Sequence, residues 1–259
     1  MIKKVVVAAA GKGTRMLDLS KDKPKHLIEV NGHPFLYYLL ANLKAAGFEE
    51  IIMVIGYKKE VMEVFLNRYK NEFNITHIIN QFDLLGEKYG TLCPVECVKD
   101  IIGHDESFMV VMGDNLYSVP DLKKLRIDDE FCYVAGLQHP EPQRYGVLVR
   151  DGDDFLEKIL EKPANPPSNL INTALYKFTP AVFKKIPLIE KSIRGEYEIT
   201  DAINLLAQEK KVKIKEIEDR WLDFGKPEDV QTISEFLNKQ CIPCSNLYPS
   251  QCFNTPKYD

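Results

Sequence analysis

The feature that most constrains this chain is a short apolar run that leads directly into a turn rich in glycine and cations. Residues 5–10 are apolar, half of them β-branched, and are followed by glycine, so they predict a buried strand. The turn at residues 11–16 exposes backbone N–H groups, and its two glycines let the backbone approach an anion closely. Lys12, Arg15 and Lys25 add three cations around the same place. Together these residues predict a site for a polyphosphate.

Two common phosphate motifs do not fit this turn. A Walker loop requires G-x-x-x-x-G-K-[ST], and a dinucleotide fold requires G-x-G-x-x-G, whereas Met16 stands at the third glycine position here. The segment Ala9-Ala10-Gly11-Lys12-Gly13-Thr14-Arg15-Met16, followed by Pro24-Lys25, resembles instead the loop of sugar-1-phosphate nucleotidylyltransferases, G-x-G-T-R-[ML] and then P-K. It is especially similar to the loop of bacterial N-acetylglucosamine-1-phosphate uridylyltransferases, and also resembles that of glucose-1-phosphate thymidylyltransferases.

This resemblance implies roles for the loop residues. Arg15 and Lys25 would be the catalytic cations, with Arg15 and Lys12 holding the departing β- and γ-phosphates and Lys25 contacting the α-phosphate in the transition state. The nucleotide would be bound by a larger set from the same segment: Ala8, Ala9, Gly11, Lys12, Gly13 and Thr14.

Composition agrees with a soluble enzyme and decides little else. The chain has 259 residues, 45% hydrophobic and 28% charged, which is enough for one large core. Its formal net charge of −4 argues against a nucleic-acid partner. Neither a membrane-spanning run nor a signal-peptide core is present, so we expect a cytoplasmic protein without a membrane partner. A homo-oligomer remains open.

The six cysteines do not form a disulfide pattern. Cys93, Cys97 and Cys132 lie in apolar or helical surroundings and are expected to be reduced, buried thiols. Cys241 and Cys244 have the spacing of zinc ligands, but no histidine follows them in the tail. A zinc site there is therefore a minor alternative.

Strands and helices alternate along the first half of the chain. Apolar periodicity predicts helices at residues 34–46, 60–73 and 95–102, and strands at residues 51–55, 75–79 and 108–112. This alternation predicts an α/β fold with a Rossmann-like, mostly parallel sheet flanked by helices on both faces. The loops after Ala10, Gly56, Ile79 and Met112 should then open onto one crevice at the carboxyl ends of the strands.

Two aspartates are candidate metal ligands. Asp114 follows the apolar strand at residues 108–112 and, on the residues alone, is equally well explained as a turn or helix cap. The family resemblance implies that it is the first magnesium ligand. Asp223 lies in Trp221-Leu222-Asp223-Phe224-Gly225, which resembles the W-x-D-x-G pattern of the thymidylyltransferases and implies the second ligand. Two carboxylates from distant segments suit a Mg²⁺ ion shared with substrate phosphates.

Three segments in the middle of the chain resemble the sugar-phosphate site of the family. They are Tyr145-Gly146-Val147, Glu161-Lys162-Pro163 and Asn172-Thr173-Ala174. The resemblance implies that Glu161 and Asn172 bind sugar hydroxyls, that Gly146 admits the sugar and that Lys162 binds its phosphate. Ala174 replaces a family glycine, so we expect a narrower pocket that prefers a hexose-1-phosphate without an N-acetyl group.

The base-binding residues have the weakest signal. Gln81, Gly90 and Thr91 resemble the family's Q…G-T-[AG] elements, and a glutamine can pair with a pyrimidine through one donor and one acceptor. Leu92 departs from the small residue that is usual after Gly-Thr. Further on, Thr200 in Glu196-Tyr197-Glu198-Ile199-Thr200-Asp201 is expected to cap the following helix.

The resemblance covers residues 1–238, the expected catalytic domain, and leaves residues 239–259 as an irregular tail. It implies that a nucleoside triphosphate, UTP or dTTP, reacts with a sugar-1-phosphate to form an NDP-sugar and pyrophosphate. It also implies Mg²⁺ as the cofactor. Two alternatives stay open: a cytidylyltransferase acting on a sugar or choline-type phosphate, and a non-catalytic nucleotide-sugar sensor on the same fold.

Overall fold

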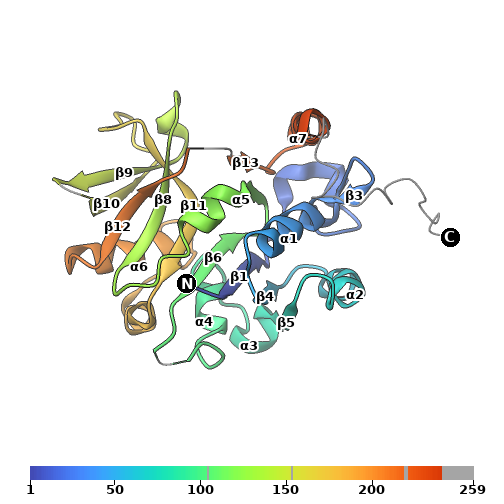
Figure 1. The fold of residues 1–259 in the computed structure, drawn as a ribbon, viewed down its shortest axis with the longest axis horizontal. Helices are drawn as coiled ribbons and strands as arrows, with labels where there is room; N and C mark the ends of the chain where they lie inside the picture. Colours follow the sequence, from blue (N-terminus) through green and yellow to red (C-terminus); the bar gives the residue numbers. More distant parts are fainter. Residues whose placement is uncertain (104, 153, 219–220, 241–259) are drawn as a thin grey trace.

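A nine-stranded sheet forms the centre of the molecule, with helices on both faces (Figure 1). The structure is a computed structural model that describes residues 1–240 except 104, 153, 219 and 220. The strand order is β5-β4-β1-β6-β11-β8-β12-β10-β9. The α/β class expected from the sequence is confirmed.

The first half of the sheet is parallel. It consists of β5 (Ile75–Asn80), β4 (Glu50–Ile55), β1 (Lys4–Ala9) and β6 (Phe108–Met112), each paired in parallel with its neighbour. The central strand β1 is buried on both faces, which explains its unbroken apolar run. All four strands are those expected from the sequence.

The second half of the sheet is mostly antiparallel. It contains β11 (Leu170–Phe178), β8 (Cys132–Gln138), β12 (Val212–Glu216), β10 (Phe155–Glu161) and β9 (Gly146–Asp151), in which only β8 and β12 pair in parallel. Strands β9, β10 and β11 follow one another without an intervening α-helix, and short connections favour antiparallel pairing. The expectation of a mostly parallel sheet thus holds only for the first half.

Two hydrophobic cores cover the two faces of the sheet. Val5 and Val7 point into one core and Val6 into the other, as alternation along a strand requires. The first core is covered by α1 (Phe35–Ala45), α2 (Lys59–Tyr69), α5 (Val119–Lys124) and α7 (Glu228–Gln240). The second is covered by α4 (Cys93–Cys97), α6 (Ile199–Gln208) and the 3-10 turns Pro180–Lys184 and Ile186–Leu188. Helix α3 (Gln81–Leu85) follows β5 directly.

Short elements complete the fold. Strands β2 (Glu29–Val30) and β3 (His33–Pro34) form a hairpin, and β7 (Asn115–Tyr117) pairs with β13 (Trp221–Asp223). The remaining 3-10 turns are Thr14–Ser20, Lys25–Leu27 and Pro142–Arg144.

Several predicted bounds were wrong. Helix α2 ends at Tyr69 and α4 comprises only Cys93–Cys97, so the helices expected at residues 60–73 and 95–102 are shorter. Thr200 lies inside the first turn of α6 rather than at its cap, because the helix already begins at Ile199.

The three cysteines among the described residues, Cys93, Cys97 and Cys132, are buried free thiols, as expected. The Cys241 and Cys244 pair lies outside the described residues. Within those residues, none of the helices combines the length and the apolar character needed to cross a membrane.

Candidate active site

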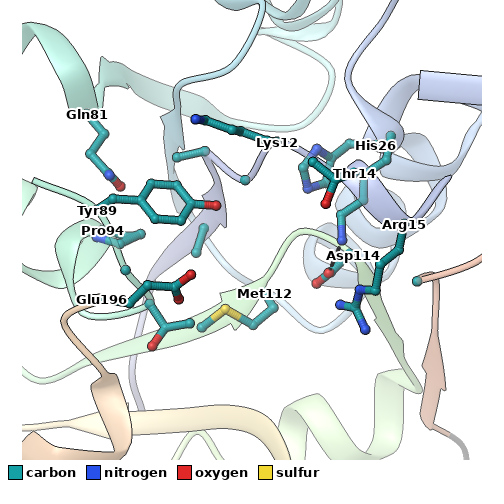
Figure 2. A pocket seen from close by; sticks show the side chains of 18 of the residues that line it. Lys12, Thr14, Arg15, His26, Gln81, Tyr89, Pro94, Met112, Asp114 and Glu196 are labelled. Carbon is teal, nitrogen blue, oxygen red and sulfur yellow. Dashed lines mark hydrogen bonds and ion pairs between the residues drawn. The ribbon is translucent and has the colours of Figure 1, made fainter. Parts of the chain in front are cut away.

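A cavity of about 650 Å³ opens at the carboxyl ends of β1, β5 and β6 (Figure 2). Most of the residues expected to bind substrate line it: Ala8, Gly11, Lys12, Gly13, Thr14, Arg15, Lys25, Gln81, Gly90, Thr91, Asp114 and Lys162. Ala9 does not line it, since its side chain is buried in the first core. Figure 2 shows Gln81 and Tyr89 on one side of the cavity and Arg15 and Asp114 on the other.

The glycine-rich loop is shaped around Lys25. Gly13 has a φ of 64°, and a Cβ added there would lie 3.1 Å from Lys25 Cβ, so only glycine combines this conformation with this contact. The Met16 side chain is fully buried below the loop, and Ser20 Oγ donates a hydrogen bond of 3.0 Å to the Gly13 carbonyl. These anchors hold the loop while Thr14 and Arg15 stay exposed at the cavity.

Lys25 and Asp114 form an ion pair in the wall of the cavity. Asn115 Nδ2 donates a hydrogen bond of 3.0 Å to the other carboxylate oxygen, Asp114 Oδ1. Burial raises the pKa of Asp114, but the charge and hydrogen bond of Lys25 outweigh burial, and the pKa lies below its ordinary value. Asp114 is therefore ionised at neutral pH.

The pairing of β7 with β13 brings Asp223 next to this site. Asp223 lies opposite Asn115 in the antiparallel register, and Phe224 N donates a hydrogen bond of 2.8 Å to the Asp114 carbonyl. Burial and the negative charge of Asp114 raise the pKa of Asp223 to about 6. Asp223 itself does not line the cavity, but Gly225 does.

The two carboxylates suit a magnesium ion. Carboxylate oxygens are the ligands that Mg²⁺ prefers, and a divalent cation would relieve the repulsion that raises the pKa of Asp223. Within the described ranges, no group of three or more histidine, cysteine, aspartate or glutamate residues could hold a metal. An ion at Asp114 and Asp223 would therefore need further ligands from substrate phosphates and water.

Gln81 lies across the cavity from Asp114 and has one side-chain atom without a hydrogen-bond partner. The side chain is 1% exposed, and its Nε2 donates a hydrogen bond of 3.2 Å to the Lys88 carbonyl. Gln81 Oε1 is buried without a partner in the described part of the chain. An unpaired buried acceptor is costly, but this oxygen is also sealed from solvent, so a donor on a ligand could pair with it only after the side chain shifts.

Gly90 and Thr91 are held against the segment before α6. Gly90 has a φ of 143°, and a Cβ added there would lie 2.2 Å from the Tyr197 carbonyl oxygen. Thr91 Oγ1 donates to Glu198 Oε2 at 3.2 Å and accepts from Ile199 N at 2.9 Å. Both residues thus have a structural role beside the cavity. Leu92 is fully buried in the second core and does not line the cavity.

The expected sugar-binding residues gather on the antiparallel half of the sheet. Gly146 lies opposite Glu161 in the register of β9 and β10, and a Cβ at Gly146 would lie 3.6 Å from Asn172 Cβ. Only Lys162 of this set lines the cavity itself. Asn172 is partly engaged by its own strand, since Nδ2 donates to Tyr176 Oη at 2.9 Å and Oδ1 accepts from Ala174 N at 3.0 Å.

Ala174 sits in an irregular stretch of β11 between Asn172 and Tyr176, with a φ of 57°. Its side chain packs against the second core, and it is not among the residues that line the cavity. The expected narrowing of the sugar pocket by this methyl group stays a prediction, since Gly146, Glu161 and Asn172 do not line this cavity either. The family usually has glycine at this position, and the alanine here has a strained, left-handed backbone.

Eight further residues line the cavity: Ala10 and Met112, which end strands expected at the crevice, and His26, Tyr89, Pro94, Arg194, Glu196 and Gly225, which were not named as site residues. Several of them adjoin recognised segments, as His26 follows Pro24-Lys25 and Arg194 precedes Glu196-Tyr197, but residue type alone does not mark them. Arg194 is held by Glu198, which accepts a hydrogen bond of 2.9 Å from its Nη2.

Comparison with known proteins adds relatives of described activity. The family model described as nucleotidyl transferase matches residues 4–240. The chain is 37% identical over 241 residues to UTP–glucose-1-phosphate uridylyltransferase AglF of Haloferax volcanii, covering 91% of this chain and 96% of that protein. It is 33% identical over 234 residues to the bifunctional protein GlmU of Methanocaldococcus jannaschii, covering 90% of this chain but only 53% of that protein.

Solved structures share the fold. A Bacillus anthracis protein assigned as a glucose-1-phosphate thymidylyltransferase superimposes with a TM-score of 0.77 and 26% identity, covering 91% of this chain and 95% of that one. A UDP-glucose pyrophosphorylase complexed with UDP-glucose superimposes with a TM-score of 0.79 over 93% of this chain and 100% of the other. Its 23% identity makes it a likeness of fold alone.

Proposed function

Because the chain belongs to the nucleotidyl transferase family, we propose that its cavity joins a nucleoside triphosphate to a sugar-1-phosphate, releasing pyrophosphate and an NDP-sugar. One observation carries this proposal. The glycine-rich loop, the Lys25–Asp114 ion pair and Asp223 converge at one edge of the sheet, although they come from three distant segments. Such a cluster suits phosphoryl chemistry, in which the protein positions the reactants and neutralises charge.

Different cations would bind different phosphate groups. Lys12 and Arg15 would bind the β- and γ-phosphates, and Lys162 the phosphate of the sugar. Lys25 would bind the α-phosphate as the sugar-phosphate oxygen attacks it in line. Lys25 is paired with Asp114 in the substrate-free protein, so it has to exchange this carboxylate for a phosphate oxygen. The attacking oxygen is already ionised at neutral pH, so the reaction requires no general base.

Asp114 and Asp223 are the residues that would hold Mg²⁺. When bound, the ion would neutralise the phosphate oxygens and help to orient the two substrates. With Asp114 engaged in holding the ion, the Lys25 ammonium would be free for the α-phosphate.

If a shift of the side chain exposes it, the unpaired oxygen of Gln81 favours a uracil or thymine base. These bases carry an N–H donor at N3, whereas N3 of cytosine is an acceptor and would face Gln81 Oε1 unfavourably. We therefore favour UTP or dTTP over CTP, and the cytidylyltransferase becomes the second candidate. Glu161 and Asn172, beside Gly146, would bind sugar hydroxyls.

We further propose that residues 1–238 act as the catalytic domain and that the reaction takes place in the cytoplasm without a nucleic-acid or membrane partner. Self-association is tested by light scattering of the purified protein. A measured molar mass near that of a single chain would exclude a homo-oligomer.

The test is pyrophosphate release from UTP, dTTP, CTP, ATP and GTP, each with a panel of sugar phosphates and choline phosphate. UTP or dTTP should exceed CTP in kcat/KM by about 100-fold, because a mismatched buried acceptor costs about 1–3 kcal/mol. A preference for CTP would select the second candidate. Nucleotide-sugar binding without pyrophosphate release from any pair would instead indicate a sensor.

A further inference from the structure

His26 is a buried imidazole in the cavity wall that the proposed reaction does not yet use. It follows Lys25 in the 3-10 turn Lys25–Leu27, is 2% exposed and lines the cavity. Figure 2 shows it on the side that carries Thr14, Arg15 and Asp114, across from Gln81 and Tyr89. This is the side on which the triphosphate is expected.

The ring is held by packing rather than by hydrogen bonds. A Cβ added at Gly113 would lie 3.1 Å from His26 Cδ2, so this edge of the ring lies against the strand end. Among the described residues, neither ring nitrogen has a hydrogen-bond partner, and only Nδ1 is also sealed from solvent. Nε2 is therefore the nitrogen that a molecule in the cavity can reach.

The proton of the ring can be assigned from this environment. The imidazole is neutral, because burial and the adjacent Lys25 ammonium hold its pKa at about 3, although Asp114 opposes them. A neutral ring carries one N–H and one lone pair. A sealed N–H without an acceptor is less tolerated than a sealed lone pair, so the lone pair belongs on Nδ1 and the proton on Nε2. His26 then offers an N–H donor to the cavity.

We propose that His26 Nε2–H donates a hydrogen bond to a phosphate oxygen of the bound triphosphate, and of the pyrophosphate that leaves. This assignment rests on the proposed function. Lys12, Arg15 and Lys25 would supply charge to the phosphates, whereas His26 would supply an uncharged donor from a buried ring in the wall. Its partner is a polyphosphate, since the base lies at the opposite end near Gln81.

The test uses two isosteres of the ring and one apolar variant. The amide nitrogen of glutamine can reach the position of Nε2, and that of asparagine the position of Nδ1. Calorimetric titration with inorganic pyrophosphate should show binding within about 3-fold of the unmodified protein for His26→Gln. His26→Asn and His26→Leu should weaken it about 10-fold, the scale of one hydrogen bond to a charged group. Affinity for a sugar-1-phosphate should stay unchanged in all three.

Three outcomes would overturn the assignment. Pyrophosphate binding by His26→Leu equal to that of the unmodified protein would do so, as would equal weakening in the glutamine and asparagine variants. Parallel losses of affinity for both ligands, together with a lower Tm, would make the ring a packing residue only. If His26→Leu fails to fold, the glutamine and asparagine pair decides. If the unmodified protein binds no pyrophosphate, the proposed function fails first.

Discussion

At the scale of single residues, the charge on Asp223 that would bind the metal ion also lowers the stability of the fold. Its pKa is about 6 in the folded protein and near 3.9 in an unfolded chain. A carboxyl whose pKa is raised by folding stabilises the fold below the unfolded value, and this contribution is lost as the pH rises through 6. The metal-free protein therefore retains a destabilising charge at neutral pH.

Asp223→Asn should raise the free energy of unfolding of the metal-free protein at pH 7.5 by about 2–3 kcal/mol, from the two-unit pKa shift. The gain should vanish below pH 4, where both forms are uncharged. Urea denaturation at several pH values measures it, with Asp22→Asn, an exposed aspartate, as the control. An Asp223→Asn gain that is equal at all pH values would rule out the electrostatic explanation.

Ala174 is strained by its left-handed backbone, with a φ of 57°. Ala174→Gly should stabilise the protein by up to about 1 kcal/mol, because relief of about 1–2 kcal/mol of strain exceeds the added entropy of the unfolded chain. Ala135→Gly, on the neighbouring strand β8 with ordinary φ, should destabilise it. Thermal unfolding distinguishes the two signs, and a loss of stability in Ala174→Gly would refute the strain argument.

Sequence reasoning found the residues that act through local chemistry. Gly13, Arg15 and Lys25 lie in one short segment whose composition already indicates an anion site. His26 and Tyr89 could not be found in this way, since an isolated histidine or tyrosine is as common in a core as in a site. Their position in the cavity depends on tertiary packing.

At the scale of elements, the segment before α6 supports the loop at Gly90. Tyr197 N donates to the Tyr89 carbonyl and Leu92 N to the Tyr197 carbonyl, both at 3.0 Å, and Gly90 lies between these bonds. A side chain at Gly90 would separate the two segments. In a variant with a side chain at position 90, the loop and the segment before α6 should therefore no longer pack against each other.

Gly90→Ala should destabilise the protein by about 2 kcal/mol or more and weaken triphosphate binding, because backbone conformation and space both exclude a Cβ. Gly32→Ala is a matched control, since Gly32 also has a positive φ of 83° but no atom within 4 Å of an added Cβ. It should cost about 1 kcal/mol and leave nucleotide affinity unchanged. Equal effects of the two substitutions on Tm and affinity would contradict this account.

The alternation of strands and helices predicted the parallel half of the sheet because each strand there is joined to the next by a helix or a helical turn. The pairing of the strands in the antiparallel half was not predicted. Strand β11 lies between β6 and β8 and pairs with neither β10 nor β12, its neighbours in sequence, and no local pattern encodes that position. The pairing of β7 with β13, which brings Asp223 to Asp114, is equally non-local.

At the scale of the whole molecule, each half of the sheet would bind one of the two substrates. The parallel half contributes the loop after β1, Gln81 after β5 and Asp114 after β6. The antiparallel half would contribute Gly146, Glu161 and Asn172 from strands β9, β10 and β11, which lie together in Figure 1. Nucleotide and sugar would thus meet where the two halves join, close to the carboxyl end of β6 and the stretch of β11 just before Leu175.

The central claim is that Asp114 and Asp223 act together in nucleotidyl transfer, and turnover of their asparagine variants tests it most directly. Pyrophosphate release from UTP and glucose-1-phosphate with Mg²⁺ should fall by about 1,000-fold in Asp114→Asn and in Asp223→Asn, because a lost metal ligand costs several kcal/mol at the transition state. Both variants should remain folded by circular dichroism, and Asp22→Asn should keep full activity. Retention of more than about a tenth of the activity in both folded variants would contradict the claim.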